Sequence, residues 1–203
     1  MTVRVKICGV TLPEDAEAAA SMGADMIGLN FYPKSPRFLD LARARELRAA
    51  TGSRVAVVGV FVNAPREAVA EHVSEIRLDM IQFHGDEPEE FLEGWPVPVI
   101  RALRLNPGGR PDTSACVRAS YLLVDSFHPE LYGGTGRARS FSDLAGADLS
   151  RVIISGGLTP DNVAEAAALR PYAVDTASGV ESRPGVKDHQ KLRRFIENAK
   201  SSR

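Results

Sequence analysis

Residues 152–160 have the sequence Val-Ile-Ile-Ser-Gly-Gly-Leu-Thr-Pro, which predicts a short buried strand, a glycine turn and the start of a helix. The strand is the apolar run Val152–Ile154, and Gly156 and Gly157 allow the chain to turn sharply after it. Thr159 and Pro160 fit a helix N-cap followed by proline at the first helical position. Repeated strand-to-helix units of this kind build parallel sheets.

Similar apolar runs recur at roughly even intervals along the 203 residues and predict seven further strands: Val3–Ile7, Met26–Phe31, Val55–Val62, Met80–Phe83, Val97–Leu103, Tyr121–Val124 and Tyr172–Val174. Helices are expected between most of them: Pro13–Met22 with a capping box from Thr11, Leu41–Ala50, Arg66–Glu75, Glu87–Glu93, Asp112–Ala119, Pro160–Leu169 and His189–Ala199.

Eight such units fit either a closed (β/α)8 barrel or an open, doubly wound sheet. The closed TIM barrel is favoured because no Gly-x-Gly-x-x-Gly motif follows the first strand, and because polar residues and glycines gather just after the strands. No linker divides the chain. We therefore expect one α/β domain, a (β/α)8 barrel, over residues 1–203.

Composition narrows the class of protein. A formal net charge of −1 argues against nucleic acid or an anionic membrane as a partner, and no run of 18 apolar residues occurs. Cys8 and Cys116 lie far apart, and His72, His128 and His189 show no metal-ligand spacing, so neither a disulfide nor a metal site is expected. The sequence predicts a soluble, cytoplasmic protein.

Cys8 ends the first predicted strand. Alternation places it on the face that also carries Arg4 and Lys6, opposite Val5 and Ile7. Because positive charge favours the reactive thiolate, Cys8 is a candidate catalytic base. The alternative is that it packs as a small apolar residue.

Asp125 ends the sixth strand and shares the inward face with Leu123, so it is a candidate acid, or else a turn cap. Strands one and six of a barrel lie roughly 12–14 Å apart, which leaves room for a small substrate. The long loop that follows contains Gly133 and Gly134 and is a candidate lid.

Two glycine-containing turns follow strands seven and eight: Gly156-Gly157, and Ser178-Gly179 after Ala177. Backbone N–H groups in such turns, together with a helix N-terminus, can bind phosphate, and barrels often bind phosphate at these two strands. Ordinary turns are the alternative. We expect a phosphate site here.

Two further mouth residues are candidates for substrate contact. Arg37, in a basic loop after the second strand, can bind a carboxylate through two hydrogen bonds or form a surface salt bridge. His84, after the fourth strand, can donate to the substrate or simply be a loop histidine.

Several segments together resemble the phosphoribosylanthranilate isomerase family of tryptophan biosynthesis: Val5–Thr11, Phe31–Arg37, Val60–Asn63, Gln82–Glu87, Gly133–Gly136, Ser155–Leu158 and Ser178–Glu181. The resemblance runs from Lys6 to about Lys187. It implies a (β/α)8 barrel, no cofactor and no metal, and a phosphosugar substrate for a monomer or homodimer. The implied reaction is an Amadori rearrangement of N-(5-phosphoribosyl)anthranilate to 1-(2-carboxyphenylamino)-1-deoxyribulose 5-phosphate.

The resemblance assigns the general base to Cys8 and the general acid to Asp125. It places the anthranilate contact at Arg37, with His84 near the substrate. Further substrate contacts are expected from Gly133 and Gly134 and from the phosphate turns: Gly156, Gly157, Asp175, Ser178 and Gly179.

The chain departs from the family pattern at Asn30, at Phe141–Asp143 and at Ala177, where a serine is common. Three other functions stay open at this point. They are a barrel isomerase of histidine synthesis, which resembles this chain but has Asp where Cys8 stands, a pentulose phosphate epimerase, and a phosphosugar-binding module without catalysis.

Overall fold

Eight parallel strands close into a barrel in the order in which they occur in the chain. The computed structural model describes residues 2–104, 118–125, 144 and 146–201. The barrel strands are β1 (Arg4–Cys8), β2 (Met26–Asn30), β3 (Ala56–Phe61), β4 (Met80–Phe83), β5 (Val99–Arg104), β6 (Tyr121–Asp125), β7 (Val152–Ser155) and β8 (Ala173–Thr176). The closed (β/α)8 barrel expected from the sequence is confirmed.

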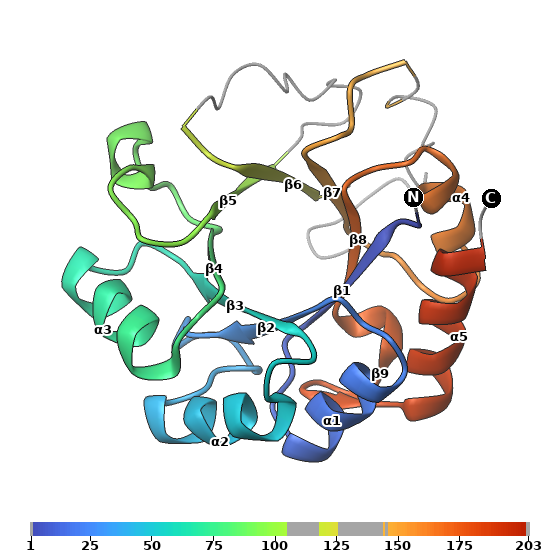
Figure 1. The fold of residues 1–203 in the computed structure, drawn as a ribbon, viewed down its shortest axis with the longest axis horizontal. Helices are drawn as coiled ribbons and strands as arrows, with labels where there is room; N and C mark the ends of the chain where they lie inside the picture. The colour runs from blue at the N-terminus through green and yellow to red at the C-terminus, as the bar shows by residue number, and fades with distance from the viewer. Residues whose placement is uncertain (1, 105–117, 126–143, 145, 202–203) are drawn as a thin grey trace.

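Figure 1 views the barrel along its axis, with the strands in a central ring and the helices outside it. The described α-helices are α1 (Pro13–Ser21), α2 (Leu41–Thr51), α3 (Arg66–Ile76), α4 (Val163–Ala168) and α5 (His189–Ser201). An antiparallel hairpin, β9 (Glu181–Arg183) and β10 (Val186–Lys187), follows β8 and was not predicted. A 3-10 helix, Ser178–Val180, joins β8 to this hairpin.

The interior of the barrel is filled by one apolar cluster, drawn from six strands: Met26, Val58, Ile100, Ala102, Leu123, Ile153 and Ala173. Side chains two positions further along a strand face the same side. The inward rows therefore continue from this cluster to the carboxyl ends of the strands, where barrel enzymes place their sites.

Three predicted helices differ from the structure, two in where they begin and one in how its start is capped. The segment Glu87–Glu93 forms only a 3-10 helix over Glu89–Leu92, because Pro88 precedes it and Gly94 turns the chain at a φ of 75°. Helix α1 begins at Pro13, as predicted, but its N-cap residue is Leu12, which has no side-chain acceptor. The Thr11 hydroxyl donates to the Gly185 carbonyl.

Helix α4 begins at Val163 rather than at Pro160. The Asn162 side chain accepts from the Thr159 N–H and donates to the Gly157 carbonyl, which closes a turn ahead of the helix. The helix N-terminus therefore does not stand directly behind the glycine pair. The expected helix Asp112–Ala119, with Cys116, lies largely outside the described residues.

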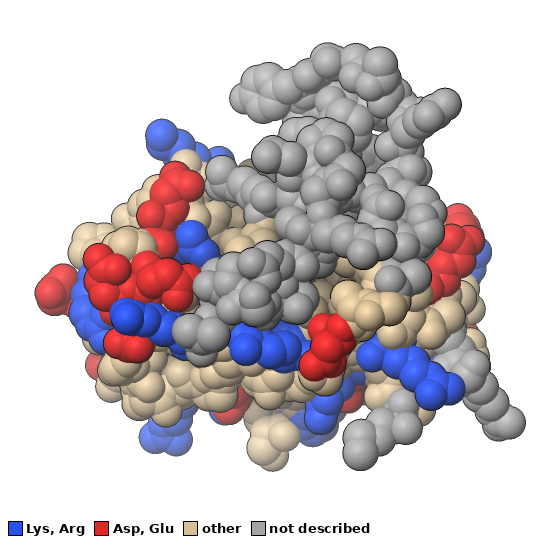
Figure 2. All heavy atoms as spheres, turned by 90° about the horizontal axis from the view of Figure 1, so that it is seen from above, with Lys and Arg blue, Asp and Glu red and all other residues tan. Residues whose placement is uncertain are grey.

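On the side of the molecule seen in Figure 2, Lys and Arg side chains are interspersed with Asp and Glu. This mixture agrees with the formal net charge of −1. None of the helices that the structure describes has the length and apolar character needed to cross a membrane.

Candidate active site

Cys8 and Asp125 lie at the same end of the barrel, at the carboxyl termini of β1 and β6. Asp125 follows the interior residue Leu123 by two positions and is in register with Ser155 of β7. Both side chains therefore extend inward rows of the barrel toward its mouth. The inward orientation expected for Asp125 agrees with this register.

A buried polar network connects β1, β8 and β7 beneath the mouth. The Lys6 ammonium lies 2.8 Å from Asp175 Oδ1, and the Ser155 hydroxyl donates to Asp175 Oδ2 at 2.8 Å. Lys6 is fully buried and Asp175 is 4% exposed. Burial alone would lower the pKa of Lys6, but the Asp175 carboxylate and the neighbouring Cys8 raise it above its ordinary value.

Gly28 leaves room for the Cys8 thiol. A Cβ at this position would stand 2.8 Å from Cys8 Sγ and 3.3 Å from Lys6 Nζ, so both atoms lie over the bare backbone of β2. The sequence placed two cations, Arg4 and Lys6, on the same strand face as Cys8, and in the structure Lys6 lies beside the Cys8 thiol. Arg4 instead lies over the Tyr172 ring at the start of the strand, 4.5 Å from its centroid.

Arg37 reaches the mouth from the loop after β2 and forms a two-bond fork with Glu181 of β9. Its Nε and Nη2 donate to the two carboxylate oxygens at 2.7 Å each. These hydrogen bonds raise the pKa of Arg37, against an opposing effect of burial. The side chain packs directly over Gly9, where a Cβ would overlap Arg37 Cδ.

Lys187 of β10 joins this pair to the end of β1. Its ammonium donates to Glu181 Oε1 at 3.0 Å, to the Cys8 carbonyl at 2.7 Å and to the Ala177 carbonyl at 3.2 Å. Burial lowers the pKa of Lys187, although Glu181 partly offsets this. Burial would raise the pKa of Glu181, but the bonds and charges of Arg37 and Lys187 hold it below its ordinary value.

His84 follows β4 on the inward row that contains Gln82. Gln82 Nε2 lies 3.0 Å from His84 Nδ1, an arrangement in which a neutral ring that accepts from the amide carries its proton on Nε2. Gln82 is 2% exposed, and its buried Oε1 has no hydrogen-bond partner among the residues that the structure describes. This polar pair faces the interior at the level of the candidate base and acid.

The two glycine turns expected to bind phosphate are held together. Gly156 and Gly157 have φ values of 88° and 66°, which favour glycine. A Cβ on Gly179 would stand 1.9 Å from the Leu158 carbonyl oxygen, and the Thr176 hydroxyl donates to that oxygen at 2.7 Å. The turns after β7 and β8 are therefore in contact.

Some expected site residues occupy other surroundings. The Asp175 carboxylate is bonded to Lys6 and Ser155 rather than lining the glycine turns. Gly133 and Gly134 lie outside the described residues. Sequence reasoning did not identify Glu181, Lys187 or Ser155 as site residues, because their partners come from distant parts of the chain. Glu181 and Lys187 did stand near the end of the family-like region, which was the available signal.

In the part of the chain that the structure describes, no group of three or more His, Cys, Asp or Glu side chains is placed to hold a metal ion. His72 bonds the Ala68 carbonyl through Nδ1 and packs against Phe31, and His189 bonds Asp15 through Nε2. These two histidines support helices α3 and α5. His128 is outside the described residues.

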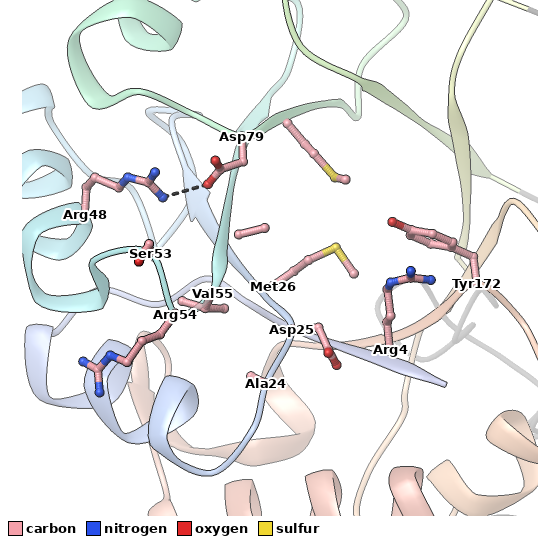
Figure 3. Close-up of a pocket in the computed structure, with 12 residues that line it drawn as sticks. Arg4, Ala24, Asp25, Met26, Arg48, Ser53, Arg54, Val55, Asp79 and Tyr172 are labelled. Atoms are coloured by element: carbon pink, nitrogen blue, oxygen red, sulfur yellow. Dashed lines mark hydrogen bonds and ion pairs between the residues drawn. The ribbon is translucent and has the colours of Figure 1, made fainter. Parts of the chain in front are cut away.

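A cavity of about 440 Å³ lies at the opposite end of the barrel, around the starts of β1, β2, β3 and β4 (Figure 3). Its charged groups include Arg48 paired with Asp79, and Arg4 beside Tyr172. Burial and a hydrogen bond with Tyr121 raise the pKa of Tyr172 to about 12. The amino ends of barrel strands contribute to stability rather than to catalysis.

The chain matches a family model described as N-(5'-phosphoribosyl)anthranilate (PRA) isomerase over residues 5–198. A curated relative, the N-(5'-phosphoribosyl)anthranilate isomerase of Pseudomonas aeruginosa (strain UCBPP-PA14), is 47% identical over 207 residues, covering 99% of this chain and 97% of the relative.

Solved structures agree with this match. Phosphoribosyl anthranilate isomerase from Thermotoga maritima is 39% identical with a TM-score of 0.87, and 98% of each chain is covered. A phosphoribosyl anthranilate isomerase solved in complex with reduced 1-(o-carboxyphenylamino)-1-deoxyribulose 5-phosphate is 36% identical to this chain, with a TM-score of 0.81 and 98% of each chain covered. A further structure describes monomers generated from the dimeric Thermotoga maritima enzyme, at 35% identity, a TM-score of 0.82 and 98% coverage of each chain.

Proposed function

This chain belongs to the N-(5'-phosphoribosyl)anthranilate isomerase family of tryptophan biosynthesis, and we propose that Cys8 is its general base and Asp125 its general acid. The reaction is the Amadori rearrangement of N-(5-phosphoribosyl)anthranilate to 1-(2-carboxyphenylamino)-1-deoxyribulose 5-phosphate. The observation that carries the assignment is the position of the two side chains, at the carboxyl ends of β1 and β6 and on inward rows of one barrel.

The two groups act in sequence. Protonated Asp125 gives its proton to the furanose ring oxygen, the bond from this oxygen to C1 breaks, and the nitrogen lone pair forms a Schiff base. The iminium acidifies C2, and the Cys8 thiolate takes the C2 proton. The resulting enolamine then tautomerises to the ketone. General acid–base steps of this kind contribute about 10²–10⁴-fold each.

The phosphate group is assigned to the turns after β7 and β8. Backbone N–H groups of Gly156, Gly157, Ser178 and Gly179 are its proposed donors, supported by the contact of the two turns at Leu158. Asp175 is assigned no direct phosphate contact, because its carboxylate would repel the anion and is already bonded to Lys6 and Ser155.

The anthranilate carboxylate is assigned to Arg37. A guanidinium has five N–H groups, and the fork with Glu181 uses two of them, so the Arg37 fork and a substrate carboxylate are compatible. His84 is proposed to donate through Nε2–H to the substrate, with Gln82 fixing the ring tautomer.

Kinetics of Cys8→Ser and Asp125→Asn test the assignment of base and acid. We expect kcat to fall by roughly 10²–10⁴-fold in each variant with KM changed little, because both groups act in the chemical step. Cys116→Ser, which removes the chain's other cysteine, is the matched control and is expected to retain activity. Near-normal kcat in both test variants would refute the assignment.

A further inference from the structure

Lys6 is a fully buried cation for which the mechanism above has no use. Burying an ion pair in a protein interior usually adds little stability, since apolar side chains of similar volume often do as well. The interior layers of a barrel are normally filled by branched apolar residues. A lysine and an aspartate in this layer therefore need a reason other than stability.

The geometry points to the Cys8 thiol as that reason. Lys6 Nζ and Cys8 Sγ both lie over Gly28, where an added Cβ would stand 3.3 Å from the first and 2.8 Å from the second. The pairing with Asp175 at 2.8 Å keeps Lys6 charged despite its burial. A positive charge near a thiol favours the thiolate over the thiol.

We propose that Lys6 is a positioning residue that stabilises the Cys8 thiolate, and that Asp175 and Ser155 hold the ammonium in place. Lys6 itself neither gives nor takes a proton. When Cys8 accepts the C2 proton it becomes a neutral thiol, and Lys6 remains an ammonium paired with Asp175. The inference rests on the proposed role of Cys8 as base.

Other charged groups face Cys8 from neighbouring elements. Arg37, from the loop after β2, and Lys187, from β10, also add positive charge, and both are bonded to Glu181 as Lys6 is to Asp175. Lys187 contacts the Cys8 carbonyl rather than its side chain.

Asp125 faces the same interior from β6 and brings a carboxyl group of its own. Among these cations, Lys6 is the one whose charged atom lies with the Cys8 thiol over Gly28.

The test is the pH dependence of Cys8 alkylation by iodoacetamide. It is measured in a Cys116→Ser background, so that Cys8 is the one thiol that reacts. In Lys6→Met we expect the rise in alkylation rate to move to higher pH, with a loss of roughly 10- to 100-fold at pH 7. The acid limb of kcat/KM should move in the same direction and KM should change little. A merely structural role would lower activity equally at every pH.

Lys6→Met leaves the Asp175 carboxylate buried without its partner and is at risk of failing to fold. Lys6→Met/Asp175→Asn removes both charges and is the second variant. Its alkylation profile should move in the same direction by a smaller amount, because it lacks the unpaired carboxylate that also disfavours the thiolate in Lys6→Met. Arg4→Met is the matched control, because it removes a cation from the same strand at the opposite end of the barrel, over Tyr172. It should leave the alkylation profile unchanged.

Two failures are distinguishable. A folded Lys6 variant whose alkylation profile overlays that of the unmodified chain would overturn the role of Lys6, even if Cys8→Ser is inactive. An active Cys8→Ser would instead overturn the role of Cys8 as base, whatever the alkylation profile shows.

Discussion

Gly28 determines how closely the Cys8 side chain can lie against strand β2. The thiol and the Lys6 ammonium occupy the space that any side chain on Gly28 would need. The nearest backbone atom to that space is Cys8 Cα, at 3.2 Å, so the strand itself leaves little room to adjust. A missing methyl group on β2 thus sets the position of the candidate base on β1.

Gly28→Ala should therefore lower kcat by about 10-fold or more, because displacements near 1 Å can cost 10²-fold in rate. Overpacking should also destabilise the fold by about 1–3 kcal/mol. Steady-state kinetics and urea unfolding measure the two effects. Gly52→Ala is the control. Its φ of 56° makes alanine strained, but the added Cβ would meet no packed neighbour within 4 Å among the described residues, so activity should persist. Unchanged kcat in Gly28→Ala would contradict the geometry described here.

Sequence alternation was sufficient to place Cys8 and Asp125 at strand ends, because the two-residue period of a strand is local information. It was not sufficient for the Lys6 network, whose partner Asp175 is 169 residues away. Alternation also grouped Arg4 with Cys8, yet four residues of strand separate them by roughly 13 Å. Facing the same side is not the same as being close.

At the scale of elements, the hairpin β9–β10 contributes a charged cluster to the mouth. Glu181 joins Arg37 from the β2 loop to Lys187, and Lys187 in turn bonds the carbonyl of Cys8. The side chains of Lys187 and Glu181 are 0% and 5% exposed, so removing either charge leaves the other without its partner away from water.

Glu181→Gln should lower the free energy of unfolding by roughly 3 kcal/mol at pH 7, as expected when a buried pair loses one partner. The pKa of Glu181 is lowered in the folded chain, so its contribution is present above the unfolded value of about 4.3 and is lost as pH falls through the folded pKa. The difference between variant and parent should therefore shrink in acid. Urea unfolding at pH 7 and below pH 4 measures it.

Glu46→Gln serves as the comparison for this prediction. Glu46 pairs with Arg43 on the surface, where the side chains are 58% and 39% exposed. Exposed pairs of this kind contribute about 0–1 kcal/mol, so little change is expected. If Glu181→Gln were equally mild, or if its effect grew as pH fell, the cluster would not have the electrostatic role described.

Element boundaries were predicted less well than element order. Pro88 and Gly94 confine the segment after β4 to one 3-10 helix, although its sequence had suggested seven helical residues. Asn162 delays α4 through its side-chain bonds to Thr159 and Gly157. These outcomes depend on local turn geometry, which composition and periodicity do not encode.

In the molecule as a whole, the candidate active site and the cavity of Figure 3 lie at opposite ends of the barrel. The carboxyl ends of the strands gather Cys8, Asp125 and the two glycine turns, while the amino ends surround the cavity of Figure 3. The order of the strands brings together residues from β1 and β8, the first and last of the barrel. The Lys6–Asp175 pair and the candidate site next to it therefore form only because the sheet closes between β1 and β8.

The most direct measurement is a crystal structure of this chain bound to reduced 1-(o-carboxyphenylamino)-1-deoxyribulose 5-phosphate. We expect Cys8 Sγ beside C2 of the sugar and the Asp125 carboxyl on the oxygen that derives from the ring. The phosphate should rest on the backbone amides of Gly156, Gly157 and Gly179. A ligand bound with C2 away from Cys8, or with its phosphate at another edge of the barrel, would contradict the account.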